Sequence, residues 1–524
     1  MYKLVTVEEA AALIRDGETI AFNGFGSMGF PEQIALAVGE RFTKTGSPRG
    51  MTFLAHAGQG VWQKGRMVEN MCQPGMVDCL IGGHITPMVN LCEQISDNAI
   101  EGYNFPMGIM SHLMRATAGR KPGILTKIGL GTFIDPRFGG GALNERSRRK
   151  LVELMEIDGE EYLFYKALKP TCTILRGTTA DPEGNITLEK EALYSDAYST
   201  ALAVKACGGT VIFQVERLSA VPADPRKVKI PGILVDYIAV VPEQWMSVIT
   251  PYNPAYIGEW HMPEEQVPAM IEDIKEKGTK AGRKRERNQL HELIARRAAM
   301  ELADGAIINL GIGIPEMIPQ AAKDMGLDMK YTLTVEGGVI GGTPAPSFDF
   351  GCAVNPEVIQ DMALQFDLYD SGCLDATFVG AMQIDCRGNV NVSKTGDKVI
   401  GVGGFTNLTQ SAKKVVYCFP FTAGGLQVDV SDRGISVVQE GRFRKFCSHI
   451  DQISASGDVA MRAGQEVLYI TERCVFRLVE GGIMLTEIAD GISLEDDILA
   501  NMDFRPMIAE SLKTMEFGGD LADE

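Results

Sequence analysis

The sequence predicts an α/β protein made of two related open α/β domains, with the functional site between them. Three observations carry this prediction. The chain has 524 residues, of which 45% are hydrophobic, and a single core rarely grows beyond roughly 250–300 residues. Short runs rich in β-branched residues alternate with helical stretches, which is typical of partly parallel sheets. One succession of elements also occurs in both halves of the chain.

That succession begins near the N-terminus and again just after the middle of the chain. Each copy reads as an amphipathic helix ended by Asp-Gly, a short apolar strand, a glycine turn and a Pro-Glu pair that opens another helix. The residues at the two turns are Asn23, Gly24, Gly26 and Gly29 in the first copy and Asn309, Gly311 and Gly313 in the second.

Later strands agree with a duplication. Gly184-Asn-Ile precedes a strand that starts at Val211, and Gly388-Asn-Val precedes a strand that starts at Val415, at the same interval. A further strand is expected from Leu234. Two matches in the same order predict tandem domains, although Asp-Gly before a strand is common by itself.

The domains are expected at residues 1–257 and 289–524, joined by a charged linker at residues 258–288. The linker contains a basic cluster, which could bind nucleic acid. It lacks interleaved aromatic residues, however, and the whole chain has a formal net charge of −18. A solvated, partly helical hinge is therefore the preferred interpretation.

Composition excludes several classes of function. The eleven cysteines include no C-x-x-C pair, and the six histidines show no ligand spacing, so we expect no metal site. No apolar run is long enough for a transmembrane helix, and the N-terminal residues lack the apolar region of a signal peptide. We expect a cytoplasmic protein with reduced cysteines and no membrane or nucleic-acid partner.

Glu336 is the main candidate for chemistry. It ends the apolar run that starts at Tyr331, Tyr331-Thr-Leu-Thr-Val, and is followed by two glycines, which leave its approach open. Ligands of open α/β folds bind at the carboxyl ends of strands. A catalytic acid is one interpretation, and a solvated or salt-bridged acid at a strand end is the alternative.

Glycine-rich loops follow other predicted strands. Gly24-Phe-Gly-Ser-Met-Gly29 matches G-x-G-x-x-G, but its partner near Gly311 does not, and no clear acidic partner for a ribose follows. A dinucleotide-dependent oxidoreductase is therefore a minor alternative. The loop Gly401-Val-Gly-Gly-Phe405 could direct successive N–H groups at an oxyanion, or it could be a tight turn.

Together, and in this order, these segments resemble the class I coenzyme A transferases, most of all the acetate and propionate CoA-transferases that carry both halves on one chain. The match runs nearly end to end. It is carried by the segments around residues 23–32, 129–137, 309–316, 335–338 and 401–405.

The resemblance assigns roles to individual residues. Glu336 matches the catalytic glutamate, and Gly403 and Gly404 match the loop that binds the oxyanion. Many relatives place a glutamine where this chain has Met107, so a backbone N–H of Met107 or Gly108 would serve instead. The residues implied to line the CoA and acyl pocket are Asn23, Gly24, Gly26, Gly29, Asn309, Gly311, Gly313 and Gly401.

The reaction implied is ping-pong transfer of coenzyme A between a short-chain acyl-CoA and a carboxylic acid, through an acyl-glutamyl anhydride and a glutamyl-CoA thioester. Coenzyme A would be a substrate, with no permanently bound cofactor, and the family implies a homo-oligomer such as a tetramer. An acyl-CoA hydrolase on the same scaffold and a non-catalytic ligand-binding protein are the alternatives.

Overall fold

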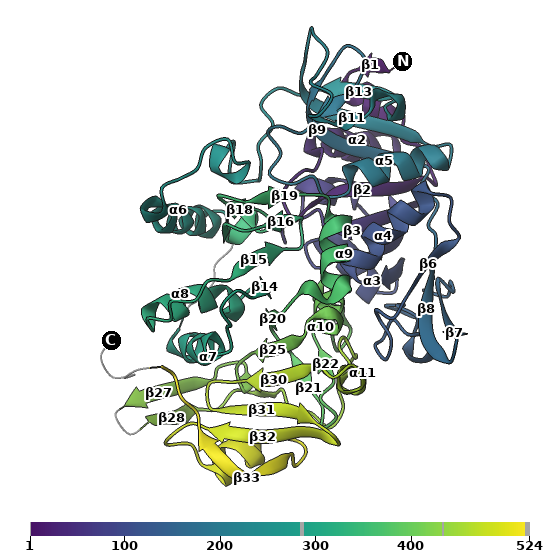
Figure 1. Cartoon of the computed structure of the whole chain (residues 1–524). Helices are drawn as coiled ribbons and strands as arrows, with labels where there is room; N and C mark the ends of the chain where they lie inside the picture. Colours follow the sequence, from purple (N-terminus) through teal and green to yellow (C-terminus); the bar gives the residue numbers. More distant parts are fainter. Residues whose placement is uncertain (1, 283–287, 432–433, 519–524) are drawn as a thin grey trace.

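The computed structural model describes residues 2–282, 288–431 and 434–518. Each half of the chain builds one ten-stranded sheet, and the two halves lie one above the other in Figure 1. The predicted α/β class is therefore confirmed. Part of the basic cluster of the predicted linker, residues 283–287, lies outside the described residues.

The first sheet is parallel along its main path. In spatial order its strands are β1 (Lys3–Val5), β13 (Tyr237–Val240), β11 (Thr210–Leu218), β9 (Cys172–Ala180), β2 (Thr19–Phe25), β3 (Met51–Ala57), β4 (Val77–Gly82) and β5 (Glu101–Asn104). Two short strands, β10 (Ile186–Thr187) and β12 (Val228–Ile230), extend it from β9 in antiparallel fashion.

The second sheet is mixed. Its strands are β19 (Val358–Ile359), β16 (Val339–Ile340), β15 (Thr332–Val335), β14 (Ile307–Leu310), β20 (Ala376–Val379), β25 (Lys414–Cys418), β30 (Glu466–Ile470), β31 (Cys474–Val479), β32 (Gly482–Ile488) and β33 (Met507–Thr514). The run from β15 to β30 is parallel, and antiparallel strands flank it on both sides. Parallel strands of this kind need crossover connections, which helices supply.

The helices of the first half are α1 (Val7–Ala12), α2 (Glu32–Thr45), α3 (Val89–Ser96), α4 (Met107–Ala118) and α5 (Ala197–Ala206). Those that follow are α6 (Val267–Lys280), α7 (Gln289–Ala299), α8 (Ile318–Asp324), α9 (Met362–Leu368), α10 (Phe405–Ser411) and α11 (Gly457–Arg462). A three-stranded antiparallel sheet of β6 (Gly123–Thr126), β8 (Glu160–Lys166) and β7 (Val152–Ile157) projects from the first half (Figure 1).

The two sheets share a strand order, which confirms two related domains. The order β13-β11-β9-β2-β3 in the first half matches β30-β25-β20-β14-β15 in the second. A turn is duplicated as well. The Asp181 carboxylate accepts the Asn185 backbone N–H at 2.9 Å, and Asp385 does the same for Asn389 at 2.9 Å.

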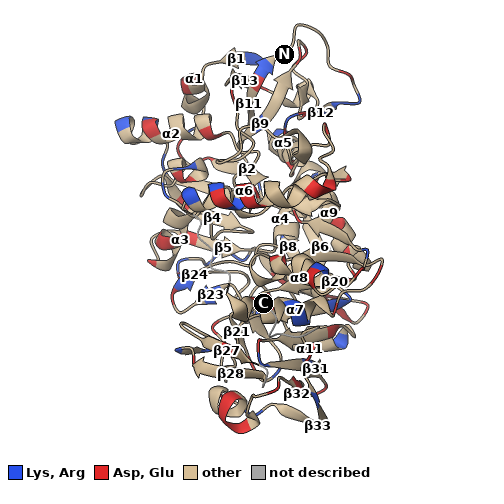
Figure 2. Cartoon of the chain, turned by 90° about the vertical axis from the view of Figure 1, so that its left-hand side faces the viewer, with Lys and Arg blue, Asp and Glu red and all other residues tan. Residues whose placement is uncertain are grey.

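The halves are joined through a common core. One apolar cluster runs from Ile20 and Phe53 of the first sheet to Phe366 and Phe476 of the second half. In the segment between the halves, α6 carries both basic and acidic residues, which Figure 2 shows in blue and red. Lys277 on this helix is paired to Asp273 at 2.7 Å. Opposite charges four residues apart are typical of a helix surface that faces water.

Candidate active site

Glu336 directly follows β15 at the carboxyl edge of the second sheet. The neighbouring strand β14 carries Asn309, which lies opposite Thr334 in the parallel register. The Asn309 side-chain Nδ2 donates to the Thr334 carbonyl at 3.2 Å, which ties the two strand ends together. Strand geometry therefore places an amide and a carboxylate at one corner of the site.

The Glu336 carboxylate is buried and incompletely paired. Its residue is 8% exposed, and within the described residues its Oε2 has no hydrogen-bond partner. Burial raises the pKa of Glu336 above the ordinary glutamate value of 4.5, while its own backbone N–H and the Asn309 side chain oppose that shift. A carboxylate that has lost its water and kept few hydrogen bonds is a more reactive nucleophile than a solvated one.

The glycine loop at residues 401–404 lies against this carboxylate. A Cβ atom on Gly404 would stand 3.1 Å from Glu336 Cγ and 3.3 Å from its Oε1, so a side chain here would push the Glu336 side chain by a few tenths of an ångström. The loop therefore places main-chain groups directly beside the carboxylate.

The three predicted oxyanion donors differ in what their N–H groups already do. The Gly403 N–H donates to the Gly83 carbonyl at 3.2 Å, and the Met107 N–H donates to the Gly403 carbonyl at 2.8 Å. In the described part of the chain, no acceptor is found for the Gly404 N–H. The Gly108 N–H, the other predicted substitute, donates to the Asn407 side chain at 3.1 Å. Gly404 is thus the donor with an unused N–H next to Glu336.

Met107 brings the first half into the site. It opens α4, is 2% exposed, and its terminal methyl would lie 3.5 Å from a Cβ on Gly404. Its N–H bond to Gly403 also crosses from one half to the other. The site therefore forms where α4 of the first half meets the glycine loop of the second, as the sequence predicts for a site between domains.

Asn104 is a residue that the sequence did not single out. It is fully buried at the end of β5, and its Oδ1 accepts the Val402 N–H at 2.9 Å. Its Nδ2 donates to the carbonyls of Gly82 and Gly83 at 2.7 and 2.5 Å. Asn104 thereby fixes the glycine loop of the second half to the first half. Its strand reads Glu-Gly-Tyr-Asn, so no apolar pattern in the sequence marks Asn104.

The first predicted turn, residues 23–29, is closed. Asn23 is 4% exposed and its Oδ1 accepts the Asp196 N–H at 2.6 Å. Ser27 donates its hydroxyl to the Phe348 carbonyl at 2.6 Å. A Cβ on Gly24 would lie 2.6 Å from the Met28 carbonyl oxygen, so this glycine serves a tight turn with φ +116°. The turn packs against the loop around residues 347–351 of the second half.

The second predicted turn is open by comparison. Gly311 and Gly313 are half-buried, and Gly313, with φ +110°, would have no atom within 4 Å of an added Cβ. Asn309 is fully buried, but its Oδ1 has no partner among the residues that the structure describes. Backbone at Gly313 is thus accessible close to the strand that carries Asn309.

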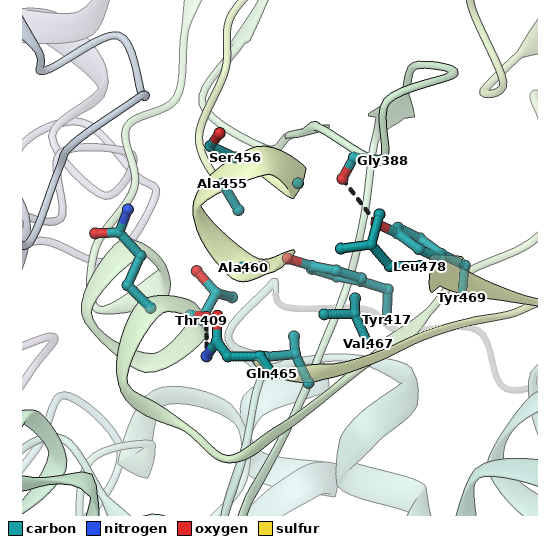
Figure 3. Close-up of a pocket in the computed structure, with 13 residues that line it drawn as sticks. Gly388, Thr409, Tyr417, Ala455, Ser456, Ala460, Gln465, Val467, Tyr469 and Leu478 are labelled. Carbon is teal, nitrogen blue, oxygen red and sulfur yellow. Dashed lines mark hydrogen bonds between the residues drawn. The ribbon is translucent and has the colours of Figure 1, made fainter. Parts of the chain in front are cut away.

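The cavity shown in Figure 3 lies away from Glu336. Figure 3 shows a cavity of about 10 Å³ lined by Tyr417, Tyr469 and Leu478, far too small for an acyl-CoA and without Glu336 in its lining. Across the described residues no group of three His, Cys, Asp or Glu side chains is placed to hold a metal ion. In the same residues, no helix has the length and apolar character to cross a membrane.

Comparison with known proteins identifies the family. The family model described as "Coenzyme A transferase" matches residues 4–240 and 291–419. Caffeate CoA-transferase of Acetobacterium woodii is 39% identical over 99% of this chain and 97% of its own length. Acetate CoA-transferase YdiF of Escherichia coli K12 is 37% identical over 98% of this chain and 94% of its own.

Solved structures agree. The apoenzyme of acyl-CoA transferase YdiF from Escherichia coli O157:H7 superposes with a TM-score of 0.90 at 35% identity, covering 100% of this chain and 98% of that one. A thioester complex of the same transferase with CoA gives a TM-score of 0.89. The chain therefore belongs to the coenzyme A transferase family and is a CoA-transferase.

Proposed function

We propose that this enzyme moves coenzyme A between a short-chain acyl-CoA and a carboxylic acid through covalent intermediates on Glu336. The observation that carries the proposal is the buried, underpaired Glu336 carboxylate beside the unused Gly404 N–H. The neighbouring acyl-CoA transferase has been solved as a thioester complex with CoA, which supports a covalent route.

In the first step a Glu336 carboxylate oxygen attacks the thioester carbonyl carbon. The carbon–sulfur bond breaks, coenzyme A leaves as a thiolate, and an acyl-glutamyl anhydride forms. A thiol with a pKa of roughly 8.5 is a good leaving group, so no proton needs to be supplied. Holding the two reactants in line replaces the high concentration that a weak carboxylate nucleophile would otherwise need.

In the second step the thiolate attacks the glutamyl carbonyl of the anhydride. The acyl group leaves as a free carboxylate, and Glu336 becomes a glutamyl-CoA thioester. A second carboxylate then repeats the steps in reverse, regenerating ionised Glu336 and releasing a new acyl-CoA. Each bond formed to a carbonyl carbon is matched by one broken, and the exchange needs neither a general base nor an oxidant.

Gly404 is the oxyanion donor that the geometry favours. Each tetrahedral intermediate places negative charge on a former carbonyl oxygen, and Gly404 has an unused N–H next to Glu336. Gly403 and Met107, the other predicted donors, would first have to release the carbonyls of Gly83 and Gly403. Loss of one such donor typically costs about 100- to 1000-fold in rate.

The proposed substrates are acetyl-CoA or propionyl-CoA with acetate or propionate, because relatives at 37% identity are acetate CoA-transferases. The relative from Acetobacterium woodii, at 39% identity, is a caffeate CoA-transferase, so an aromatic acid is the second class to test. The open turn at Gly311 and Gly313, with Asn309 and Gly401, is proposed to line the CoA and acyl pocket. The domain limits, a homo-oligomer such as a tetramer and a cytoplasmic location remain predictions.

The decisive experiment traps the intermediate. The protein is incubated with propionyl-CoA and no acceptor, treated with borohydride, digested and analysed by mass spectrometry. Borohydride cleaves a glutamyl thioester, reducing the carboxyl carbon to an alcohol and releasing CoA as the thiol. We therefore expect Glu336 to be found reduced to an alcohol, a change absent in Glu336→Ala and present in the exposed control Glu480→Ala. Rapid release of propionate and CoA without acceptor would instead favour the hydrolase, and an unmodified, inactive protein would favour the ligand-binding alternative.

A further inference from the structure

Helix α4 of the first half begins against the second half and not on a cap of its own. Its N-cap residue, Pro106, makes no side-chain cap bond. The first two N–H groups of the helix instead cross the boundary. Met107 donates to the Gly403 carbonyl at 2.8 Å, and Gly108 donates to Asn407 Oδ1 at 3.1 Å. The first N–H groups of a helix have no partner inside it, so the second half supplies this cap.

The bond from Met107 fixes the peptide unit that carries the proposed oxyanion donor. The Gly403 carbonyl and the Gly404 N–H belong to one planar unit, and in a trans peptide these two groups point in opposite directions. The α4 N–H that holds the carbonyl therefore also sets the direction of the Gly404 N–H. A shift of α4 against the loop would turn that N–H relative to Glu336.

Asn407 holds α4 in this position. It is fully buried and lies in α10, three residues after Gly404. While its Oδ1 accepts the Gly108 N–H, its Nδ2 donates to the two carboxylate oxygens of Asp370 at 3.2 and 3.4 Å. A Cβ on Gly108 would stand 2.8 Å from Asn407 Nδ2 and 2.5 Å from Phe366 Cδ1. The backbone of α4 thus begins in direct contact with the helix that follows the glycine loop.

Asp370, which anchors the amide, is itself held from both halves. Ser411 of α10 donates to its Oδ1 at 3.1 Å, and His112 Nδ1 of α4 lies 4.0 Å from its Oδ2. The same histidine places Nε2 3.0 Å from Asp367 Oδ1 of α9, and Arg115 donates to Asp367 at 2.6 Å. Helices α4, α9 and α10 are therefore joined where the two halves meet (Figure 1).

We infer that Asn407 is a positioning residue for CoA transfer, whose side-chain amide holds the first turn of α4 against α10 and so keeps the Gly403–Gly404 peptide oriented for the reaction. An amide suits this place because it offers an acceptor to Gly108 and a donor to Asp370 at once, which neither a leucine nor an aspartate can do. The inference rests on the proposed role of Gly404 as oxyanion donor.

The test compares Asn407→Ala with the matched control Asn389→Ala. Asn389 Oδ1 accepts the N–H of Gly457, the first residue of α11, at 2.9 Å, and its Nδ2 donates to Asp385 at 2.8 Å. The bonding pattern is the same, but these partners all belong to the second half. Both variants leave a helix N–H without its acceptor, so both should lower the melting temperature.

The two variants should differ in catalysis. Asn407→Ala is expected to lower kcat by about 10- to 100-fold with KM for propionyl-CoA within about twofold, because a misplacement near 1 Å costs on the order of 100-fold. Asn389→Ala should keep kcat. Single-turnover formation of the Glu336 thioester should slow in Asn407→Ala by the same factor as kcat, which places the effect on the chemical step.

Asp370→Ala gives a second readout. It releases the Nδ2 end of Asn407 but leaves the Oδ1 acceptor for Gly108, so kcat should fall by only about 3- to 10-fold. The double variant should lose no more than about twofold beyond Asn407→Ala, because residues in one chain of contacts are not additive. If Asn407→Ala does not fold, Asp370→Ala against the control Asp385→Ala decides by the same criterion.

Unchanged kcat in Asn407→Ala would overturn the inference, and so would an equal loss of kcat in Asn407→Ala and Asn389→Ala or a loss confined to KM. Failure of the proposed function looks different. The unmodified enzyme would then transfer no CoA, Glu336→Ala would remain active, or Gly404→Ala would keep its full kcat.

Discussion

The two duplicated turns both follow a buried strand with an asparagine and glycines, but the first turn is covered by the other half and the second is open. In the first half, Asn23 is satisfied by the Asp196 N–H, and the turn is covered by the loop around Phe348 of the second half. In the second half, Asn309 keeps an unpaired Oδ1, and the backbone at Gly313 is open. One copy has become part of the contact between the halves, and the other is free to serve a ligand.

The next strand of each half shows the same division. Strand β15 is followed by Glu336, whereas its counterpart β3 is followed by Gly58 and Gln59. The Gln59 side chain donates to the Gly24 carbonyl at 3.1 Å and so braces the closed turn. Duplication supplied two equivalent strand ends, and only one of them carries an acid. Equivalent positions in the two halves thus differ in use: one joins the halves, and the other carries the acid that we propose for catalysis.

The largest expected effect is at the acid itself. Glu336→Ala removes the nucleophile and should lower kcat by at least about 10⁴-fold. Glu336→Asp keeps the charge but withdraws it by one methylene, and a misplacement near 1 Å costs on the order of 100-fold. Steady-state transfer from propionyl-CoA to acetate measures both. Equal activity of the two variants would contradict a role in attack.

The second largest effect is expected at Gly404. A Cβ there would press on Glu336 at 3.1–3.3 Å and disturb the one unused N–H, so Gly404→Ala should lower kcat by about 100- to 1000-fold. Gly119→Ala, at the C-terminal end of α4, is the control, because Gly119 has φ −82° and an added Cβ would make only ordinary contacts, the nearest at 3.5 Å. Single-turnover formation of the CoA adduct reports the step. A loss confined to KM would argue against oxyanion binding.

The paired asparagines give an intermediate effect that tests the comparison directly. Asn309→Ala should lower kcat by about 10- to 100-fold, because Glu336 loses the amide beside it. Asn23→Ala leaves the Asp196 N–H without its acceptor and should cost about 1–3 kcal/mol of folding free energy, with kcat of the folded enzyme retained. Kinetics and denaturant melts on both variants decide. If Asn23→Ala lowered kcat and Asn309→Ala lowered only the folding free energy, the closed turn would be the one that takes part in the reaction.

The smallest expected effect is on pH dependence. Glu336 must be ionised to attack, and burial raises its pKa, so kcat should fall as pH decreases with a midpoint above 4.5. Asn309→Ala should move the midpoint higher, since the Asn309 side chain lowers this pKa. A kcat–pH profile on each protein measures the shift. Movement to lower pH would contradict the assigned contact.

Local patterns in the sequence predict the fold class and the main candidate residues of the site. The run into Glu336 and the glycines at residues 401–404 stood out because a strand that ends in an acid, and adjacent glycines, both have few purely structural reasons to exist. The strand expected from Leu234 instead starts at Tyr237, because Gly232–Leu234 form a 3-10 turn.

Other features depend on contacts that no local pattern encodes. The closure of the first turn joins Ser27 to Phe348, and the support of the glycine loop joins Asn104 to Val402, each across about 300 residues. Which duplicated turn is covered is likewise decided only by tertiary packing.

The bonds that cross between the halves also bear on how the enzyme is made. Asp196 completes the start of α9, and Met107 closes onto Gly403. Glu336, the nucleophile that we propose, belongs to the second half, so a ribosome that has delivered only the first half has produced a scaffold without it. Under the proposed mechanism, CoA transfer also needs residues of the second half, so a nascent chain acquires the activity only late in translation.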